Sequence, residues 1–363
     1  MKVKHRMIAQ YIRERIERGC YDEKGMLESE NELVSRFSVS RATARQALAS
    51  LETDGLIERQ QGKRSLLTGG ASLYRGRIYN RVGVIRLADA YDMFEPLQQG
   101  IASQLDADGY EVYALPCEES ARDERICLLK MLNEKLDGLI IEGIVTGLPT
   151  PNMDLYHKLA KLRIPLVFTD GYHAGVHASH LLVNDRDIIK HMVGHLAELG
   201  HTRIGGIFCM TQIQGISRYQ GYVDGLREKG LDYDDDRVLL LTTRDRKYVF
   251  DNLYNAYRTS ILDSTAMVCY SDYFAHYLAI TLLRDGITVP DGMSITGLDD
   301  ARLTLYGRLR LTTAAHPKGA MGRRAAQMLH TMITTRRAVA DEMMDMTFIP
   351  GNTTARTSAP ASV

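Results

Sequence analysis

With 363 residues, of which 45% are hydrophobic and 25% charged, the chain has the composition of an ordinary globular protein of two or three compact units, which excludes disordered and fibrous classes. It contains no run of about 18 apolar residues, and its basic N-terminus lacks the apolar segment of a signal peptide, so we expect a cytoplasmic protein without a membrane span. The net charge is zero, but the first 70 residues carry +3 and the remainder −3, a mild asymmetry that permits a DNA-binding N-terminus.

Three helices and a hairpin are predicted in the first 70 residues. The first helix has one apolar face, because isoleucine recurs at every fourth position, at residues 8, 12 and 16. Ser29 and Glu32 form a capping box at the start of a short second helix that ends near residue 38. Ser40 caps a third helix that runs to Gly55, and two short strands, 56–60 and 65–67, follow it around the turn at 61–64.

This order of elements predicts a winged helix-turn-helix. The third helix fits the major groove, where arginine donates two hydrogen bonds to guanine, while the hairpin tip reaches phosphates or the minor groove. The pattern alone also fits a small helical domain whose arginines are only solvated. The candidate DNA-binding residues are Arg41, Thr43, Arg45, Gln46, Gln61, Lys63 and Arg64.

A more specific pattern is carried by three segments of this region: LESENEL (27–33), VSRATARQAL (39–48) and GLIERQQG (55–62). Through them, residues 4–68 resemble the GntR family of bacterial regulators. The resemblance implies DNA binding, with Arg41 and Arg45 at recognition-helix positions and the hairpin turn as the wing. Glu28 and Asn31 stand where the family usually has proline and arginine, so the DNA contact of that family arginine is not transferred to this chain.

The pattern changes after a linker at residues 71–80, which has small-residue clusters and no apolar period. Apolar strands then alternate with helices through residues 81–357, which predicts an α/β fold with parallel, doubly wound sheets. This length exceeds one ordinary sheet, so we expect two lobes with a ligand between them, at the carboxyl ends of the strands. The expected strands are 81–85, 111–115, 139–141, 165–168, 204–208, 238–242, 266–269 and 293–297; the expected helices are 97–105, 126–132, 155–162, 188–199, 221–229, 248–260 and 274–284.

Several segments of this second region carry a family pattern: LDGLI (136–140), IPLVFTD (164–170), HLAELGHTRI (195–204), VPDGMSITGLDD (289–300) and LTTAAHP (311–317). They are similar to the effector domain of LacI/GalR regulators, which has the fold of type I periplasmic sugar-binding proteins. A GntR head on such a body is the arrangement of arabinose-repressor-like proteins. Ser271 and Leu298 depart from the usual Asn and aromatic residue, and the chain has no Trp, so the identity of the ligand stays open.

The resemblance implies an effector site in the predicted cleft. We place Arg218 after a loop at 211–217 and before a helix, where its guanidinium can donate paired hydrogen bonds to hydroxyl groups or a carboxylate. Asp299 follows a strand and can accept from two sugar hydroxyls. Structural alternatives are an interdomain salt bridge for Arg218 and loop capping for Asp299. The candidate effector-binding residues are Asp89, Tyr91, Phe94, Asp170, Arg218, Asp272, Tyr273 and Asp299.

No enzymatic, metal or cofactor site is predicted. His191 and His195 are four residues apart on a helix but lack the glutamate of a zinc protease, and three further histidines (173, 177 and 180) are expected in a loop. The five scattered cysteines form no CxxC pair, which predicts free thiols.

We therefore predict a homodimeric transcriptional repressor that binds operator DNA and is controlled by an unphosphorylated sugar. One alternative is the same architecture sensing a nucleoside or another metabolite. Two others are an α/β enzyme with a regulatory head and a simple sugar-binding module.

Overall fold

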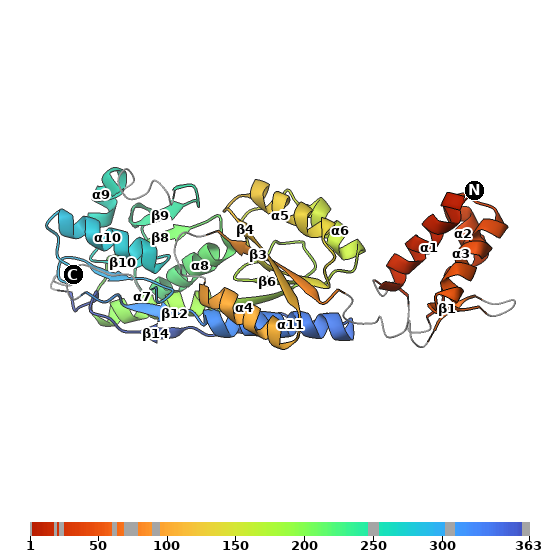
Figure 1. The fold of residues 1–363 in the computed structure, drawn as a ribbon. Helices are drawn as coiled ribbons and strands as arrows, with labels where there is room; N and C mark the ends of the chain where they lie inside the picture. The colour runs from red at the N-terminus through yellow and green to blue at the C-terminus, as the bar shows by residue number, and fades with distance from the viewer. Residues whose placement is uncertain are drawn as a thin grey trace.

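The computed structural model describes residues 2–17, 20–21, 25–59, 64–68, 79–88, 95–245, 254–301 and 309–357. Figure 1 shows a small helical head at the N-terminus, followed by a larger body with two α/β lobes. Among the described residues, none of the helices is long and apolar enough to cross a membrane.

The head is the winged helix-turn-helix that the sequence predicts. Helices α1 (Lys2–Glu17), α2 (Glu30–Phe37) and α3 (Arg41–Thr53) precede the antiparallel strands β1 (Ile57–Glu58) and β2 (Leu66–Leu67). The Ser29–Glu32 capping box starts α2 and Ser40 caps α3, so both helix starts lie where their sequence signals predict. The core of the head consists of aliphatic side chains from all three helices and β1, among them Ile8, Ile12, Leu33, Leu51 and Ile57.

The first lobe of the body, called the N-lobe here, is built on a six-stranded parallel sheet of order β13-β7-β6-β5-β3-β4. Helices α4 and α11 cover one face of this sheet, and α5 and α6 cover the other. Its strands are β3 (Arg81–Leu87), β4 (Glu111–Cys117), β5 (Gly138–Glu142), β6 (Leu166–Thr169), β7 (Ser179–Val183) and β13 (Glu342–Met344), and its helices are α4 (Glu95–Ala107), α5 (Ala121–Asn133), α6 (Met153–Lys161) and α11 (Lys318–Thr335).

The second lobe, the C-lobe, has a four-stranded parallel sheet of order β11-β10-β8-β9. Helices α7 and α8 pack on one face, and α9 and α10 on the other. A two-stranded antiparallel sheet of β12 and β14 joins it at Thr312. The strands are β8 (Ile204–Cys209), β9 (Val238–Leu241), β10 (Ala266–Cys269), β11 (Ser294–Thr296), β12 (Thr313–Ala315) and β14 (Thr347–Ile349), and the helices are α7 (Asp185–Glu198), α8 (Ile213–Glu228), α9 (Tyr254–Leu262) and α10 (Asp272–Arg284), with a short 3-10 turn at Asp235–Arg237.

The α/β prediction is confirmed, but several elements were missed. Strand β7 contains His180, which the sequence places in a loop, and α8 begins at Ile213, within the expected loop at 211–217. Helix α11 was not predicted because methionine and alanine, rather than leucine and isoleucine, form much of its buried face. This helix crosses α4 so closely that a Cβ at Gly322 would lie 2.1 Å from the Leu97 carbonyl oxygen.

Candidate functional site

The first candidate site is the exposed face of α3. Arg41, Arg45 and Gln46 are exposed there. Thr43 is half-buried, and its hydroxyl lies 2.9 Å from the Ser40 hydroxyl at the N-cap. The N-terminal residues of a recognition helix are those that reach base edges, so this face has the composition and position of a DNA-reading surface.

In the head, two of the three candidate arginines are paired with acidic residues of α2. Arg45 contacts Glu30 at 3.1 Å, and Arg64 contacts Glu32 at 2.7 Å. The hydrogen bond from Arg45 lowers the pKa of Glu30. Each acidic partner competes with a DNA base or phosphate for the same guanidinium. Gln61 and Lys63 lie outside the described residues.

Replacing Glu30 with glutamine is expected to strengthen operator binding about three- to tenfold, because a charge-assisted bond to Arg45 and a negative charge near DNA are both removed. The operator for this measurement is a palindromic site selected from a random-sequence duplex library. Glu14→Gln on α1 is the matched control, since it removes one exposed acidic charge elsewhere in the head. A weaker complex for Glu30→Gln would show instead that Glu30 orients Arg45 for DNA.

The second candidate site is a buried cluster of charged residues around Arg218. The structure corrects the sequence prediction here, because Arg218 lies inside α8 rather than before a helix. Its Nε donates to Asp185 Oδ1 at 2.6 Å, and its Nη1 donates to the Tyr270 carbonyl oxygen at 2.6 Å. Its Nη2 lies 3.8 Å from Asp299 Oδ1. Arg218 is only 4% exposed, so these partners replace solvent for the guanidinium.

The cluster extends to the N-lobe through Asp170, which follows β6. Asp170 Oδ1 lies 2.7 Å from His316 Nε2, and Lys318 Nζ donates to the Asp299 carbonyl oxygen at 3.2 Å. Burial alone would raise the pKa of Asp170 and lower that of His316, but the pairing reverses both directions and favours carboxylate and imidazolium. The cluster therefore combines acidic and basic side chains from both lobes.

Strained backbone conformations occur in the Arg218 cluster. Asp170 has φ 61°, Asp299 has φ 111° and Asp300 has φ 48°, all in the left-handed region that non-glycine residues rarely adopt. Strained residues of this kind concentrate at functional sites, where the surrounding structure holds them.

Of the other predicted effector residues, Asp272 and Tyr273 have structural partners. Asp272 accepts hydrogen bonds from the Thr313 hydroxyl at 2.6 Å and from the Ala301 amide at 2.8 Å. Tyr273 lies against Tyr277, with ring centroids 4.6 Å apart. Asp89, Tyr91 and Phe94 lie outside the described residues.

Burial raises the pKa of Asp272 to about 7, against an ordinary value of about 4. A raised carboxyl pKa means that the folded state binds the proton more tightly, so this group's contribution to stability is full below about pH 4 and is lost as the pH rises to about 7. In wild type this loss of unfolding free energy amounts to at most about 1.4 kcal/mol per pH unit. Asp272→Asn should remove it, because the neutral amide mimics the protonated acid. Urea unfolding of both proteins between pH 5 and 8 measures the difference. Asp300→Asn is the neighbouring exposed control, and parallel pH profiles of wild type and Asp272→Asn would contradict the assignment.

Three cluster residues were missed by the sequence reasoning. Asp185 follows β7, a strand that was not predicted, and so carried no recognisable signal. His316 and Lys318 follow β12, and only the LTTAAHP segment (311–317) pointed to that region, without a role for His316. Among the described residues, no group of three or more His, Cys, Asp or Glu side chains could hold a metal ion.

The chain matches two family models that correspond to its two parts. Residues 4–66 match the bacterial regulatory proteins of the gntR family, and residues 193–354 match a periplasmic binding protein-like domain. These matches define a DNA-binding transcriptional regulator with an α/β effector domain, as the exposed α3 and the two lobes indicate.

Relatives that match over most of their length identify the group of regulators to which the chain belongs. The chain is 30% identical to the arabinose metabolism transcriptional repressor of Geobacillus stearothermophilus, over 91% of this chain and 90% of that protein. It is 28% identical to the repressor of the same name from Halalkalibacterium halodurans, over 93% and 91% of the two chains. The chain therefore belongs to the family of GntR-type regulators with a periplasmic-binding-protein-like effector domain, which confirms the resemblance found in the sequence.

Solved structures show the same fold. A transcriptional regulator CelR–cellobiose complex matches with a TM-score of 0.66 at 18% identity, covering 87% of this chain and 91% of that one. A LacI transcriptional regulator from Alkaliphilus metalliredigens complexed with D-xylulofuranose matches with a TM-score of 0.63 at 18% identity, covering 76% and 99%.

Proposed function

We propose that this regulator is a cytoplasmic repressor whose operator affinity is lowered by an unphosphorylated sugar bound at the Arg218 cluster. The observation that carries the proposal is the buried set of paired charges contributed by both lobes. Such a set has donors and acceptors in one place, and sugar hydroxyl groups both donate and accept hydrogen bonds. The sugar ligands named for structural neighbours and the arabinose named for the relatives support the same ligand class.

The charge balance favours a neutral sugar over a phosphorylated one. Asp170, Asp185 and Asp299 face three cations, Arg218, His316 and Lys318. A phosphate group would bring about two further negative charges into this balanced set, without a surplus cation to neutralise them. A pentose such as arabinose is the first ligand to test.

Control of DNA binding requires that the sugar distinguishes two states of the protein. In the structure, the Arg218 guanidinium is bonded to Asp185 and the Tyr270 carbonyl oxygen and lies near Asp299. A sugar that replaces some of these hydrogen bonds would stabilise a different arrangement of the two lobes. The population would then shift toward a state in which the DNA-binding heads are spaced differently.

In the proposed regulator, residues 1–70 are the DNA-binding head, residues 71–80 are the linker, and residues 81–357 are the effector-binding and dimerisation body. α3 would read bases through Arg41, Arg45 and Gln46, with Thr43 at the start of the helix and the wing residues Gln61, Lys63 and Arg64 on the backbone. In the body, Asp89, Tyr91 and Phe94 would complete the sugar site beside Asp170, Arg218 and Asp299, and Asp272 and Tyr273 would support it from α10.

A homodimer is expected, because one head has a small interface and two-fold proteins match two-fold operators. Sedimentation should give a dimer for the full chain. A monomer both free and bound to the selected operator would contradict the dimer.

The ligand class is tested by thermal melting with a panel of free sugars, phosphorylated sugars and nucleosides. One free sugar should stabilise the protein, by about 2.7 kcal/mol at a hundred times its Kd. Stabilisation by a nucleoside or a phosphorylated sugar alone would overturn the sugar assignment and favour the alternative sensor.

A further inference from the structure

The end of the N-lobe where the strands begin carries an unusual group of basic residues. We refer to Lys135, Lys158, Lys161, Arg163 and Arg337 as the basic end. All five are exposed, and none of them forms an ion pair with another residue in the part of the chain that the structure describes. Other exposed basic residues, such as Arg125 and Arg186, have acidic partners at 2.6–2.8 Å.

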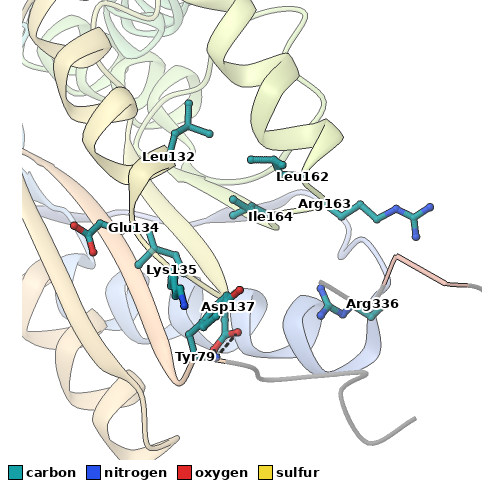
Figure 2. A pocket seen from close by; sticks show the side chains of 10 residues that line it. Tyr79, Leu132, Glu134, Lys135, Asp137, Leu162, Arg163, Ile164 and Arg336 are labelled. Atoms are coloured by element: carbon teal, nitrogen blue, oxygen red, sulfur yellow. Dashed lines mark hydrogen bonds between the residues drawn. The ribbon is translucent and has the colours of Figure 1, made fainter. Parts of the chain in front are cut away.

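Figure 2 shows the hollow at the centre of this region, with Lys135, Arg163 and Arg336 coming from three different segments around it. The side chain of Arg163 extends away from the hollow. The nearby acidic residues are already engaged. Glu134 pairs with Arg81 at 2.7 Å, and buried Asp137 accepts from the Tyr79 amide at 3.0 and 3.1 Å.

Helix dipoles account for only part of this charge. The basic end lies at the C-termini of α5, α6 and α11, each of which carries roughly half a negative charge that favours nearby cations. Five cations exceed these three half charges, so a positive surplus faces solvent. Repulsion within such a positive surplus lowers the stability of the fold unless an anionic partner neutralises it.

The chain itself places DNA within reach of the basic end. Tyr79 lies at the hollow, and eleven residue steps separate it from Thr68, the last described residue of the head. Even a fully extended chain of this length spans only about 40 Å, so the head remains close to this end of the N-lobe. Figure 1 shows the head beyond the same end. When α3 lies in the major groove, duplex outside the head's own site is therefore within reach of the basic end.

We propose that the basic end is a second DNA-contacting surface, which binds phosphates of the duplex outside the bases that the head reads. The inference rests on the DNA-binding function of the head and adds a contact made by the body. It predicts a sequence-independent, salt-sensitive part of the binding affinity that needs DNA longer than the head's own site.

The test compares two charge-reversed proteins by fluorescence anisotropy. Lys161→Glu/Arg163→Glu alters the basic end, and Arg284→Glu/Arg356→Glu makes the same net-charge change on exposed residues of the C-lobe. Each is titrated with the selected operator trimmed to its two half-sites and with the same operator extended to about 60 base pairs of mixed sequence, across a range of salt concentrations.

On the extended duplex, Lys161→Glu/Arg163→Glu should bind about tenfold more weakly than wild type, with a salt slope shallower by about 2. On the trimmed operator its affinity should stay within about twofold of wild type, as should that of the control on both duplexes. Equal affinity and slope on the extended duplex, or an equal loss in the control, would overturn the inference. Failure of every variant and the wild type to select any operator would instead overturn the function of the head. Thermal melting verifies that both variants are folded.

Discussion

Replacing Arg218 with alanine is expected to lower the free energy of unfolding by about 3–5 kcal/mol and to abolish the response to sugar. The guanidinium neutralises the charge of the Asp185 carboxylate, which lies 2.6 Å away, and it also lies 3.8 Å from the Asp299 carboxylate. All three side chains are at most 10% exposed. Removing one partner of a buried ion pair leaves an uncompensated charge in a poorly solvated place, which typically costs this amount. Urea unfolding of the wild type and variant measures the change.

The control for this prediction removes both charges of the pair. Arg218→Met/Asp185→Asn replaces the ion pair with an apolar and a neutral side chain of similar size, so it should recover most of the lost stability. It should still fail to bind sugar in calorimetry, because the guanidinium donors are gone. Sugar binding that survives in the stable double variant would remove Arg218 from the proposed site.

Alanine at Arg41 or Arg45 is expected to weaken operator binding by about 1–3 kcal/mol each, a loss of roughly 5- to 150-fold, because a bidentate contact to a base is removed. Both side chains are exposed on α3 and contribute nothing to its buried core, so the variants should keep the stability of the wild type. Gel-shift titration on the selected operator gives the loss, and titration on a mixed-sequence duplex should show a smaller one.

Arg13→Ala is the matched control for the recognition helix. Arg13 is a cation of the same head, but it lies on α1 and pairs with Asp54 at the end of α3. Its loss should change operator affinity by less than about threefold, through net charge alone. If Arg41→Ala and Arg45→Ala bind the operator as tightly as this control, α3 is not the reading helix.

Much of the fold could be predicted because local signals and tertiary structure agree. The apolar runs at β5 and β8 are buried on both faces of parallel sheets, as continuous hydrophobic strands usually are. The caps at Ser29 and Ser40 fix both helix starts in the head. In contrast, the first turn of α8 contains Gly215, which looks like a loop residue. It is required because a Cβ there would lie 1.7 Å from the Cys209 carbonyl oxygen.

The composition of the candidate site could be predicted only in part. Arg218, Asp170 and Asp299 lie close together in the structure, although they are far apart in the sequence. Their partners could not be identified in the same way, since Asp185 and His316 reach the cluster only through pairings between distant segments. Single-sequence patterns report local periodicity and contain no direct information on such long-range contacts.

The most direct test of the proposed function is operator affinity measured with and without the sugar identified by melting. We predict that a saturating free sugar lowers the affinity of the wild type at least about tenfold, corresponding to a coupling free energy of about 1.4 kcal/mol. In Arg218→Met/Asp185→Asn, operator affinity should be the same with and without the sugar. An operator complex that no free sugar weakens, or one that responds equally in this variant, would contradict control of DNA binding through the Arg218 cluster.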